Sequence, residues 1–596
     1  MVRSVKFAAP KLLQTRLQLW RSRFIFSLVA LCFVALGGKA LYLQTMSAPF
    51  LQAQGAQRYE KTIELQANRG RILDRHGAVL ASSLPARSVW AYPDRVDLSD
   101  PRVMDVARLL DIKPLDLQRR LTAEDKSFVF LKRQVDVDTA ERIKALRIKG
   151  IGQDGEYKRT YPEGEIAAHL VGFTDISHVG QEGLELSFQA TLAGHPGSRR
   201  VMRDGTGQII GGIDQVREPR DGRDLRLTID TRIQSKTFEA LKESITESRA
   251  KAGAAVVLDA KTGEVLALAN WPSYNPNERS RLSGAQLRNR AITDLYEPGS
   301  TLKVFTAALA LESGKYRPGS IVDAREGKLK IGRDTIRDAH RVKELLTIEQ
   351  VIQKSSNIGT AKLALSLPAE DQWRLLTAAG FGQAPKIGFP GAASGRLRPY
   401  KKWKPIEQAT ISYGHGISVS LLQMARAYTV FSGNGELLPV KIFKTEDEQR
   451  GRPMQVSLRA RDDETVRGIP VIKPETAAAI RKMLEMAAGP KGTAPNSQVH
   501  GYRVGGKTGT TTKNENGRYV KKYVASFVGM APMSDPRIIV AVMIDEPSAG
   551  KYYGGQIAGP VFSKIAGDTL QMLSVEPDAP FETMISPMVA LTKEGV

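Results

Sequence analysis

The sequence has few of the residue types on which many exported enzymes depend. It contains one cysteine in 596 residues, Cys32, and this residue lies inside an apolar stretch, which excludes an internal disulfide and a thiolate metal site. The seven histidines include no HExxH zinc motif, and no serine stands in a G-x-S-x-G turn. We therefore expect no metal and no cofactor, and the pattern gives little support to a zinc hydrolase or a Ser-His triad.

Long apolar runs are also scarce, and the one present lies near the N-terminus. Phe24 to Gly38 are uncharged, and Ala40 to Leu43 continue the run after Lys39. The cations that precede it are Arg3, Lys6, Lys11, Arg16, Arg21 and Arg23. This pattern predicts a cytoplasmic tail (1–23) and a single membrane anchor (24–46), with the rest exported. A cleaved signal peptide ending at Gly38-Lys39-Ala40 is the alternative, but the apolar run is long for one.

The net charge of +23 does not by itself indicate nucleic-acid binding. Acidic residues are mixed with Lys and Arg throughout, and no basic run is interleaved with aromatic residues, so we expect no nucleic-acid partner. The length predicts about two to four domains. Residues 47–225 form a mixed region of short strand-like runs, in which Arg69 to Gly77 has the alternating charges of a strand held by ion pairs.

The pattern becomes more regular after a turn-rich joint at 218–222. Two strand runs, 254–258 and 264–268, form a predicted hairpin, and three more runs follow at 502–506, 523–530 and 537–544, with a turn at Asn516-Gly517. Helical patterns lie between the early and late strands. We therefore predict an α+β fold in which residues 226–575 form one antiparallel sheet covered by helices, the last at 559–573, followed by a tail at 576–596.

The strongest candidate nucleophile is Ser300, with Lys303 three residues later. Ser-x-x-Lys also occurs at Ser248 and Ser548, but only Ser300 opens an apolar, buried-type helix, predicted over 301–311. Residues three apart share a helix face, and burial lowers the pKa of a lysine toward the range where it accepts a proton. The helix N-terminus adds backbone donors beside the hydroxyl.

Two further polar motifs follow in order. Ser355-Ser356-Asn357 ends a short helix that begins with the capping box Thr347 to Gln350, which can project a hydroxyl and an amide into a cleft. Lys507-Thr508-Gly509-Thr510 stands at the end of the strand run 502–506, where a Gly-rich edge lets a substrate backbone lie alongside and Lys507 suits a carboxylate. Each triplet alone could occur by chance.

Together, Ser-x-x-Lys, Ser-x-Asn and Lys-Thr-Gly resemble the penicillin-recognising serine enzymes. The segment Arg69 to Arg75 resembles the opening motif of class B penicillin-binding proteins, which lies in their non-catalytic pedestal. Four shorter motifs of that family are also present, namely Arg159-Thr160-Tyr161-Pro162, Gly183-Leu184-Glu185, Asn289-Arg290-Ala291 and Tyr553-Gly554-Gly555. The resemblance covers nearly the whole chain after residue 40 and is strongest to the division-specific branch, of which FtsI (penicillin-binding protein 3) is the type.

The resemblance implies a two-step acyl transfer and a role for each motif residue. Ser300 would attack a stem-peptide D-Ala carbonyl while Lys303 takes its proton, and Ser355 would pass a proton to the leaving amine. Asn357 would bind the donor backbone and help to hold Lys303. Lys507 would supply positive potential, with Thr508, Gly509 and Thr510 binding the substrate and its carboxylate. The oxyanion hole would be the N–H groups of Ser300 and Thr510.

The resemblance also implies partners and a location. Expected partners are peptidoglycan stem peptides, lipid-linked nascent glycan, β-lactams bound covalently, a membrane glycan polymerase of the FtsW type, and other division proteins. The expected location is the cytoplasmic (inner) membrane at the septum, with the catalytic domain in the periplasm. An elongation-specific relative is the nearest alternative. A β-lactam sensor or a division scaffold fits less well, since one span and a large pedestal precede the catalytic region.

Overall fold

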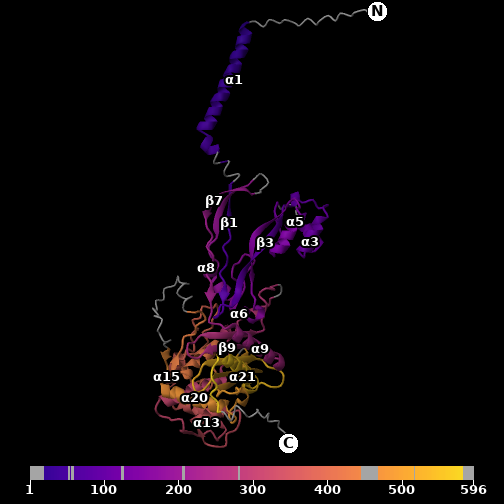
Figure 1. Cartoon of the computed structure of the whole chain (residues 1–596). Coiled ribbons are helices and arrows are strands. Elements are labelled where there is room, and N and C mark those ends of the chain that lie inside the picture. Colours follow the sequence, from indigo (N-terminus) through magenta and orange to yellow (C-terminus); the bar gives the residue numbers. More distant parts are fainter. Residues whose placement is uncertain are drawn as a thin grey trace, which may run out of the picture. The chain divides into compact units, whose positions relative to one another are not determined.

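The computed structural model describes residues 19–51, 54, 60–122, 127–203, 209–279, 282–444, 468–515 and 517–580. The chain forms two compact units, one of residues 1–67 with 195–220 and one of residues 68–194 with 221–596 (Figure 1). The basic residues before position 19, Asn516 of the predicted turn, and positions 581–596 of the predicted tail lie outside the described residues. The predicted boundary between pedestal and catalytic domain at 225/226 stays a prediction.

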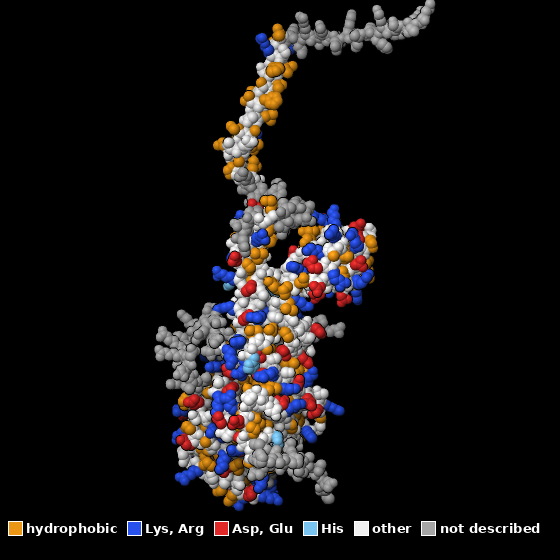
Figure 2. Space-filling model, in the orientation of Figure 1, with side chains coloured by type: hydrophobic (Ala, Val, Ile, Leu, Met, Phe, Trp, Pro, Cys, Tyr) orange, Lys and Arg blue, Asp and Glu red, His pale blue; other side chains and the backbone are white. Residues whose placement is uncertain are grey.

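The first unit contains the apolar helix and a small sheet. Helix α1 (Leu19–Thr45) has 27 residues and begins five residues before the predicted anchor. At a rise of 1.5 Å per residue it is about 40 Å long, enough to cross a hydrocarbon core of about 30 Å. Figure 2 shows apolar and uncharged side chains along it, and within the described residues it is the one helix that could span a membrane. The sheet has the order β1 (Glu60–Leu65), β6 (Gly197–Arg203), β7 (Ile209–Arg217).

The second unit is built on a five-stranded antiparallel sheet. Its order is β10 (Val265–Trp271), β9 (Ala252–Asp259), β19 (Ile538–Asp545), β18 (Arg518–Ala531), β17 (Gly505–Glu515). Strands from both ends of the region therefore meet in one sheet, which confirms the predicted α+β fold. The strand predicted at 502–506 was misplaced, because β17 begins at Gly505 and runs through the Lys507 motif, where its backbone pairs with β18.

Helices cover both faces of this sheet. Helices α9 (Thr231–Ser248) and α21 (Gly554–Met572) pack on one face, and Figure 1 shows them beside β9. The other face meets α12 (Lys303–Glu312), α17 (Leu421–Ala427) and α20 (Pro474–Ala488). The alternation of β9 divides its side chains between the two cores, with Val256 in one and Val257 in the other. The last helix was expected from residue 559 and begins five residues earlier, at Gly554.

A second sheet in this unit has the order β4, β3, β2, β8, with β5 also pairing with β3. Its strands are β2 (Ile72–Leu73), β3 (Val79–Ala91), β4 (Val129–Val135), β5 (Ile151–Thr160) and β8 (Leu225–Arg226). Only two residues of the segment from Arg69 to Gly77 form a strand, so the expected longer strand is not made. The ion pairs are made, however: Arg69 and Arg159 both bind the fully buried Glu185 carboxylate, at 2.5 and 2.7 Å.

The remaining elements are short. The helices are η1 (Pro93–Arg95), α3 (Arg102–Leu109), α4 (Pro114–Leu121), α5 (Val137–Ala145), η2 (Gly164–Ile166), α6 (Ala168–Val171), α7 (Gly183–Ser187), α8 (Gln189–Leu192), α10 (Gly284–Leu287), α11 (Arg290–Thr293), η3 (Gly299–Leu302), α13 (Ile348–Gln353), α14 (Asn357–Leu365), α15 (Ala369–Ala378), η4 (Tyr400–Lys402), α16 (Pro405–Ile411), α18 (Thr429–Ser432) and η5 (Pro495–Ser497). The strands are β11 (Ile321–Val322), β12 (Lys328–Ile331), β13 (Asp334–Arg337), β14 (Leu346–Thr347), β15 (Glu436–Leu437) and β16 (Ile469–Pro470).

Candidate active site

Ser300 lies in the short 3₁₀ helix η3, which leads directly into α12. In a 3₁₀ helix, residues three apart eclipse one another, so Ser300 and Lys303 share one side of the turn. The α-helix was predicted to begin at Thr301 and begins two residues later, at Lys303. Gly299 has a φ of +56° and its N–H donates to the Gly414 carbonyl at 3.1 Å. A Cβ at Gly299 would meet Thr511 at 2.5 Å, so glycine lets this turn approach β17.

Lys303 is fully buried in the core that surrounds α12. The side chains from Lys303 to Ala310 are all buried, as the apolar sequence of the helix predicts. Burial lowers the pKa of the Lys303 amine well below its usual value, and the nearby charge of Lys507 lowers it further, against an opposing effect of Asp338. Burial therefore favours the neutral form of the Lys303 amine, which is the form that can accept a proton.

The Ser355 hydroxyl lies between two buried lysines. Lys303 Nζ donates to the Ser355 carbonyl at 2.5 Å and contacts its Oγ at 3.1 Å, while Lys507 Nζ donates to the same Oγ at 2.9 Å. Ser355 has a φ of +59° in the loop between α13 and α14. The capping box of Thr347 and Gln350 that starts α13 is present as predicted. The three sequence motifs are thus joined at one hydroxyl.

Asn357 does not make the expected contact with Lys303. Its Nδ2 donates to the Arg337 carbonyl at 2.9 Å, and within the described residues the hydrogen bonds of the Lys303 amine go to two oxygen atoms of Ser355. The expectation was wrong because Asn357 opens α14 and turns toward the end of β13, while the loop residue Ser355 faces α12.

Asp338 is a residue of this region that the sequence did not reveal. Its carboxylate accepts from Ser356 Oγ at 2.7 Å, from the Asn357 N–H at 2.5 Å and from the Ile358 N–H at 3.0 Å. It therefore caps the first turn of α14 and fixes the loop that carries Ser355. Asp338 follows the hairpin strand β13, 17 residues before Ser355 in the chain. No sequence motif in that segment indicates that it contacts the Ser355 loop.

Lys507 and its neighbours form part of the edge strand β17. Lys507 is fully buried, and burial lowers its pKa to about 7. Gly509 permits close packing, since a Cβ there would meet Ser526 Oγ at 2.3 Å and the Pro298 carbonyl at 2.8 Å. Thr508 Oγ1 contacts Thr493 Oγ1 at 3.0 Å. The strand is thereby held against the turn that carries Ser300.

Thr510 links β17 to the start of α21. Its Oγ1 accepts the Gly554 N–H at 2.9 Å, and a Cβ at Gly554 would lie 2.4 Å from the Gly509 carbonyl. The Thr510 nitrogen is 3.8 Å from the position that a Cβ would take at Gly299. The motif Tyr553-Gly554-Gly555 therefore packs against the strand, and the backbones of Ser300 and Thr510 belong to neighbouring segments.

A hollow continues along β17 beyond Thr510. This β17 hollow has a volume of about 630 Å³ and is lined in part by Glu297, Thr511 and Tyr519. Burial alone would raise the pKa of Glu297, but hydrogen bonds from His415, the Gly416 amide and Tyr519 lower it overall. A peptide lying along β17 would extend into this hollow.

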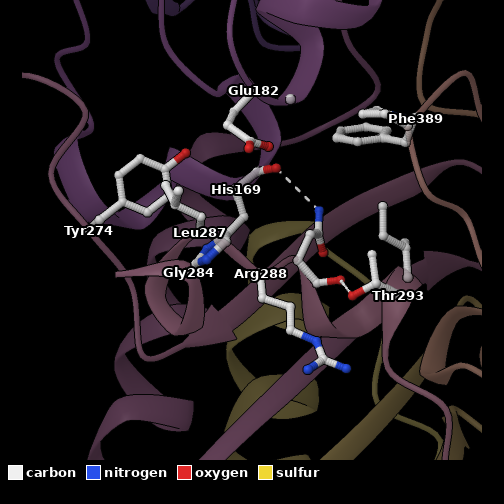
Figure 3. A pocket seen from close by; sticks show the side chains of 12 residues that line it. His169, Glu182, Tyr274, Gly284, Leu287, Arg288, Thr293 and Phe389 are labelled. Atoms are coloured by element: carbon white, nitrogen blue, oxygen red, sulfur yellow. Dashed lines mark hydrogen bonds between the residues drawn. The ribbon is translucent and has the colours of Figure 1, made fainter. Parts of the chain in front are cut away.

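A separate hollow of about 320 Å³, the His169 pocket, is drawn in Figure 3. It is lined by His169, Glu182 and Tyr274, among others, and by none of the eight predicted site residues. His169 Nε2 lies 2.7 Å from the Gln286 carbonyl, and burial lowers the pKa of His169 to about 4. The His169 pocket is thus distinct from the cluster around Ser300.

Comparisons with known proteins identify two domains in this chain. Residues 253–567 match the model of the penicillin-binding protein transpeptidase domain, and residues 64–227 match the penicillin-binding protein dimerisation domain. The chain is 42% identical over 566 residues to the probable peptidoglycan D,D-transpeptidase PenA of Neisseria meningitidis, covering 94% of both chains. It is 38% identical over 568 residues to the peptidoglycan D,D-transpeptidase FtsI of Escherichia coli, covering 94% of this chain and 93% of that one.

Solved structures give the same result. The transpeptidase domain of penicillin-binding protein 3 from Burkholderia pseudomallei is 49% identical, with a TM-score of 0.53, over 59% of this chain and 98% of that one. Penicillin-binding protein 3 of Mycobacterium tuberculosis, solved with aztreonam, is 28% identical, with a TM-score of 0.66, over 87% of this chain and 99% of that one. The likeness therefore extends over both domains.

Proposed function

Because this chain belongs to the class B penicillin-binding proteins, with a dimerisation domain before a transpeptidase domain, we propose that it cross-links peptidoglycan through an acyl-enzyme on Ser300. The observation that carries the assignment of residues is the Ser355 hydroxyl, which lies 3.1 Å from the Lys303 amine and 2.9 Å from the Lys507 amine. Two buried lysines with lowered pKa values around one hydroxyl form a proton-transfer site.

In the proposed acylation, Ser300 Oγ attacks the carbonyl that joins the two terminal D-Ala residues of a stem peptide. A neutral amine has two N–H groups and one lone pair. Lys303 directs its N–H groups to the two oxygen atoms of Ser355, which leaves the lone pair to accept the Ser300 proton. The N–H groups of Ser300 and Thr510 stabilise the oxyanion, where one donor contributes about 3 to 4 kcal/mol in measured cases.

Collapse of the tetrahedral intermediate breaks the C–N bond and releases D-Ala. Ser355 Oγ accepts from both lysines, so its own proton is free to pass to the leaving amine, and Lys303 then passes the proton taken from Ser300 to Ser355 Oγ. Lys507, Thr508 and Thr510 bind the terminal carboxylate, and Asn357 binds the donor backbone through its oxygen atom. Gly509 lets the strand pack against the turn that carries Ser300.

The acyl group then passes to an amine of a neighbouring stem, which restores Ser300 and completes the cross-link. A β-lactam carries its own strained amide, so Ser300 opens the ring and the acyl group stays attached. The remaining donor residues lie along β17 toward the β17 hollow. The β-lactam-binding activity and the cross-linking activity therefore depend on the same serine.

The proposal extends to organisation and location. Residues 47–225 serve as a pedestal and 226–575 as the catalytic domain, anchored in the inner membrane by α1 with the short N-terminus in the cytoplasm and the rest in the periplasm. The name of the FtsI relative supports a septal role over an elongation role. The partners are nascent lipid-linked glycan, an FtsW-type polymerase and other division proteins. A tagged copy that stays away from mid-cell in dividing cells would contradict the septal role.

The test of the chemistry is intact-mass measurement of the full chain in detergent after penicillin treatment, followed by peptide mapping. We expect one adduct on Ser300, and its loss in Ser300→Ala and Lys303→Ala. The matched controls are Ser248→Ala and Ser548→Ala, which alter the other two Ser-x-x-Lys serines. The hydroxyls of these serines donate to the backbone carbonyls of Ser244 and Arg249. An adduct that persists in Ser300→Ala would reject the assignment.

A further inference from the structure

A third hollow lies at the end of the catalytic sheet, farther along β17 from Lys507. This strand-end hollow has a volume of about 420 Å³ and lies between the sheet residues Lys513, Val524 and Asp545 and the segment that carries Arg288, Arg290 and Tyr296. It shares four wall residues with the β17 hollow, namely Leu295, Tyr296, Lys513 and Val524. The two hollows are therefore neighbours on the face of the sheet that carries Ser300.

The distance along β17 suits a stem peptide. Lys513 is three residues beyond Thr510, and at about 3.3 Å per residue the separation along the strand is about 10 Å. If the proposed function holds, a pentapeptide whose fourth carbonyl reacts at Ser300 has three further residues, which span about 10 Å when extended. The N-terminal part of the donor peptide therefore reaches the strand-end hollow.

The charges around the strand-end hollow favour an anion. On one side, Arg288 Nε and Arg290 Nη1 share the Asp294 carboxylate at 2.5 and 3.1 Å. On the other side, Lys513 and Lys251 face two acids, since Lys513 pairs with Asp545 at 2.9 Å and both lysines pair with Glu546. The first side has two guanidinium groups for one carboxylate, so it carries the uncompensated positive charge.

Arg288 is the group best placed to use that charge. Its side chain is 55% exposed, and its ion pair with Asp294 engages Nε, which leaves both Nη groups without a hydrogen bond in the described part of the chain. Arg288 lines both the His169 pocket and the strand-end hollow, and Figure 3 shows its guanidinium pointing away from His169 and Glu182. A planar guanidinium with two N–H edges binds a carboxylate in a bidentate manner.

The inner wall also contains unsatisfied polar atoms. Within the described residues, Arg290 Nε and Tyr296 Oη are buried and have no hydrogen-bond partner. Buried polar groups normally have partners, so this wall has hydrogen-bonding capacity that its own structure does not use. The combination of a cavity, excess positive charge and unused donors is that of a binding site rather than of a packed core.

We propose that the strand-end hollow is a recognition subsite for a free carboxylate on the donor stem peptide, bound by Arg288. The subsite makes Arg288 a specificity-determining residue that acts on substrate binding and does not take part in proton transfer. It selects stems with a free carboxylate over stems in which that group is amidated. The proposal rests on the proposed transpeptidase function.

The test uses two penicillins whose acyl side chain is a stem-derived tripeptide, one with its carboxylate free and one with it amidated. The second-order rate constant of acylation is measured with the full chain in detergent. We expect the free acid to react about tenfold faster than the amide, the size of one charge-assisted hydrogen bond at a part-exposed site. In Arg288→Gln the ratio should fall to about one, with the rate for the amide unchanged.

The matched control is Arg374→Gln on α15, which alters an exposed arginine that also pairs with a single acid, Glu370. It should keep the tenfold ratio. Benzylpenicillin, which lacks the tripeptide, should acylate all three proteins equally. A wild-type ratio near one, a ratio that persists in Arg288→Gln, or an equal loss with benzylpenicillin in that variant overturns the subsite. Failure of the proposed function is a different result, namely no acylation of the wild type by any penicillin.

Discussion

The contact of Asp338 with the loop of Ser355 allows a quantitative prediction. Asp338→Ala removes three hydrogen bonds at once, to Ser356 Oγ and to the N–H groups of Asn357 and Ile358. Loss of a helix N-cap costs about 1 to 2 kcal/mol, and Asp338 is only half-buried, so the unit should still fold. The larger effect falls on geometry, because a displacement of about 1 Å in a catalytic group can cost a factor of about 100.

We therefore expect Asp338→Ala to label with fluorescent penicillin about 10 to 100 times more slowly than the wild type. Asp338→Asn should be milder, since its Oδ1 still accepts both N–H groups. It removes a negative charge that raises the pKa of Lys303, so the rising limb of its pH profile should move to lower pH. The assay is the second-order labelling rate between pH 5 and 9, with circular dichroism as the measure of folding.

The matched control is Asp334→Ala, an exposed acidic residue on the same hairpin. It should label at the wild-type rate. The reasoning is refuted if folded Asp338→Ala labels within twofold of the wild type, or if Asp334→Ala is slowed to the same extent. An unchanged pH profile in Asp338→Asn would remove the electrostatic part of the argument and leave only the positioning part.

Further predictions concern pH, the buried ion pair and the strand edge. The acylation rate should rise with pH as Lys303 loses its proton, and it should fall as Lys507 loses its own. For the free enzyme the fall should lie near pH 7, and in Lys507→Arg it should move to higher pH. Because folding lowers the pKa of Lys507 to about 7, the unfolded chain binds more protons than the folded chain above that pH. Stability to urea should therefore increase from about pH 7 to 9, and it should increase less in Lys507→Met. Glu185→Gln should destabilise the second unit by about 3 to 5 kcal/mol in urea unfolding, since it leaves two buried arginines uncompensated. Arg71→Ala, which breaks an exposed ion pair, should lower the free energy of unfolding by less than about 1 kcal/mol. Gly509→Ala should abolish penicillin labelling because its Cβ would collide with Ser526, and normal labelling would show that the strand can move away from Ser300.

Much of the fold follows from local patterns in the sequence. The apolar run near the N-terminus became α1, the hairpin predicted at 254–268 became β9 and β10, and the capping box at Thr347 starts α13. Most of the errors concern boundaries, and one expected strand, over Arg69 to Gly77, is reduced to the two residues of β2. The strand expected at 502–506 was placed by its apolar residues, whereas β17 is defined by backbone pairing with β18, which continues through the polar residues after Gly505.

The sequence by itself determined the identity and order of the motifs, the buried character of the helix after Ser300, and hence the lowered pKa expected for Lys303, because periodicity and composition report burial. Only the tertiary structure decided which side chains meet. Ser355 contacts lysines that are 52 and 152 positions away, Asp338 binds the backbone of the loop that carries Ser355, and Glu185 joins two arginines from different motifs. Such partners are set by how helices and strands pack against one another, and a local pattern carries no record of that packing.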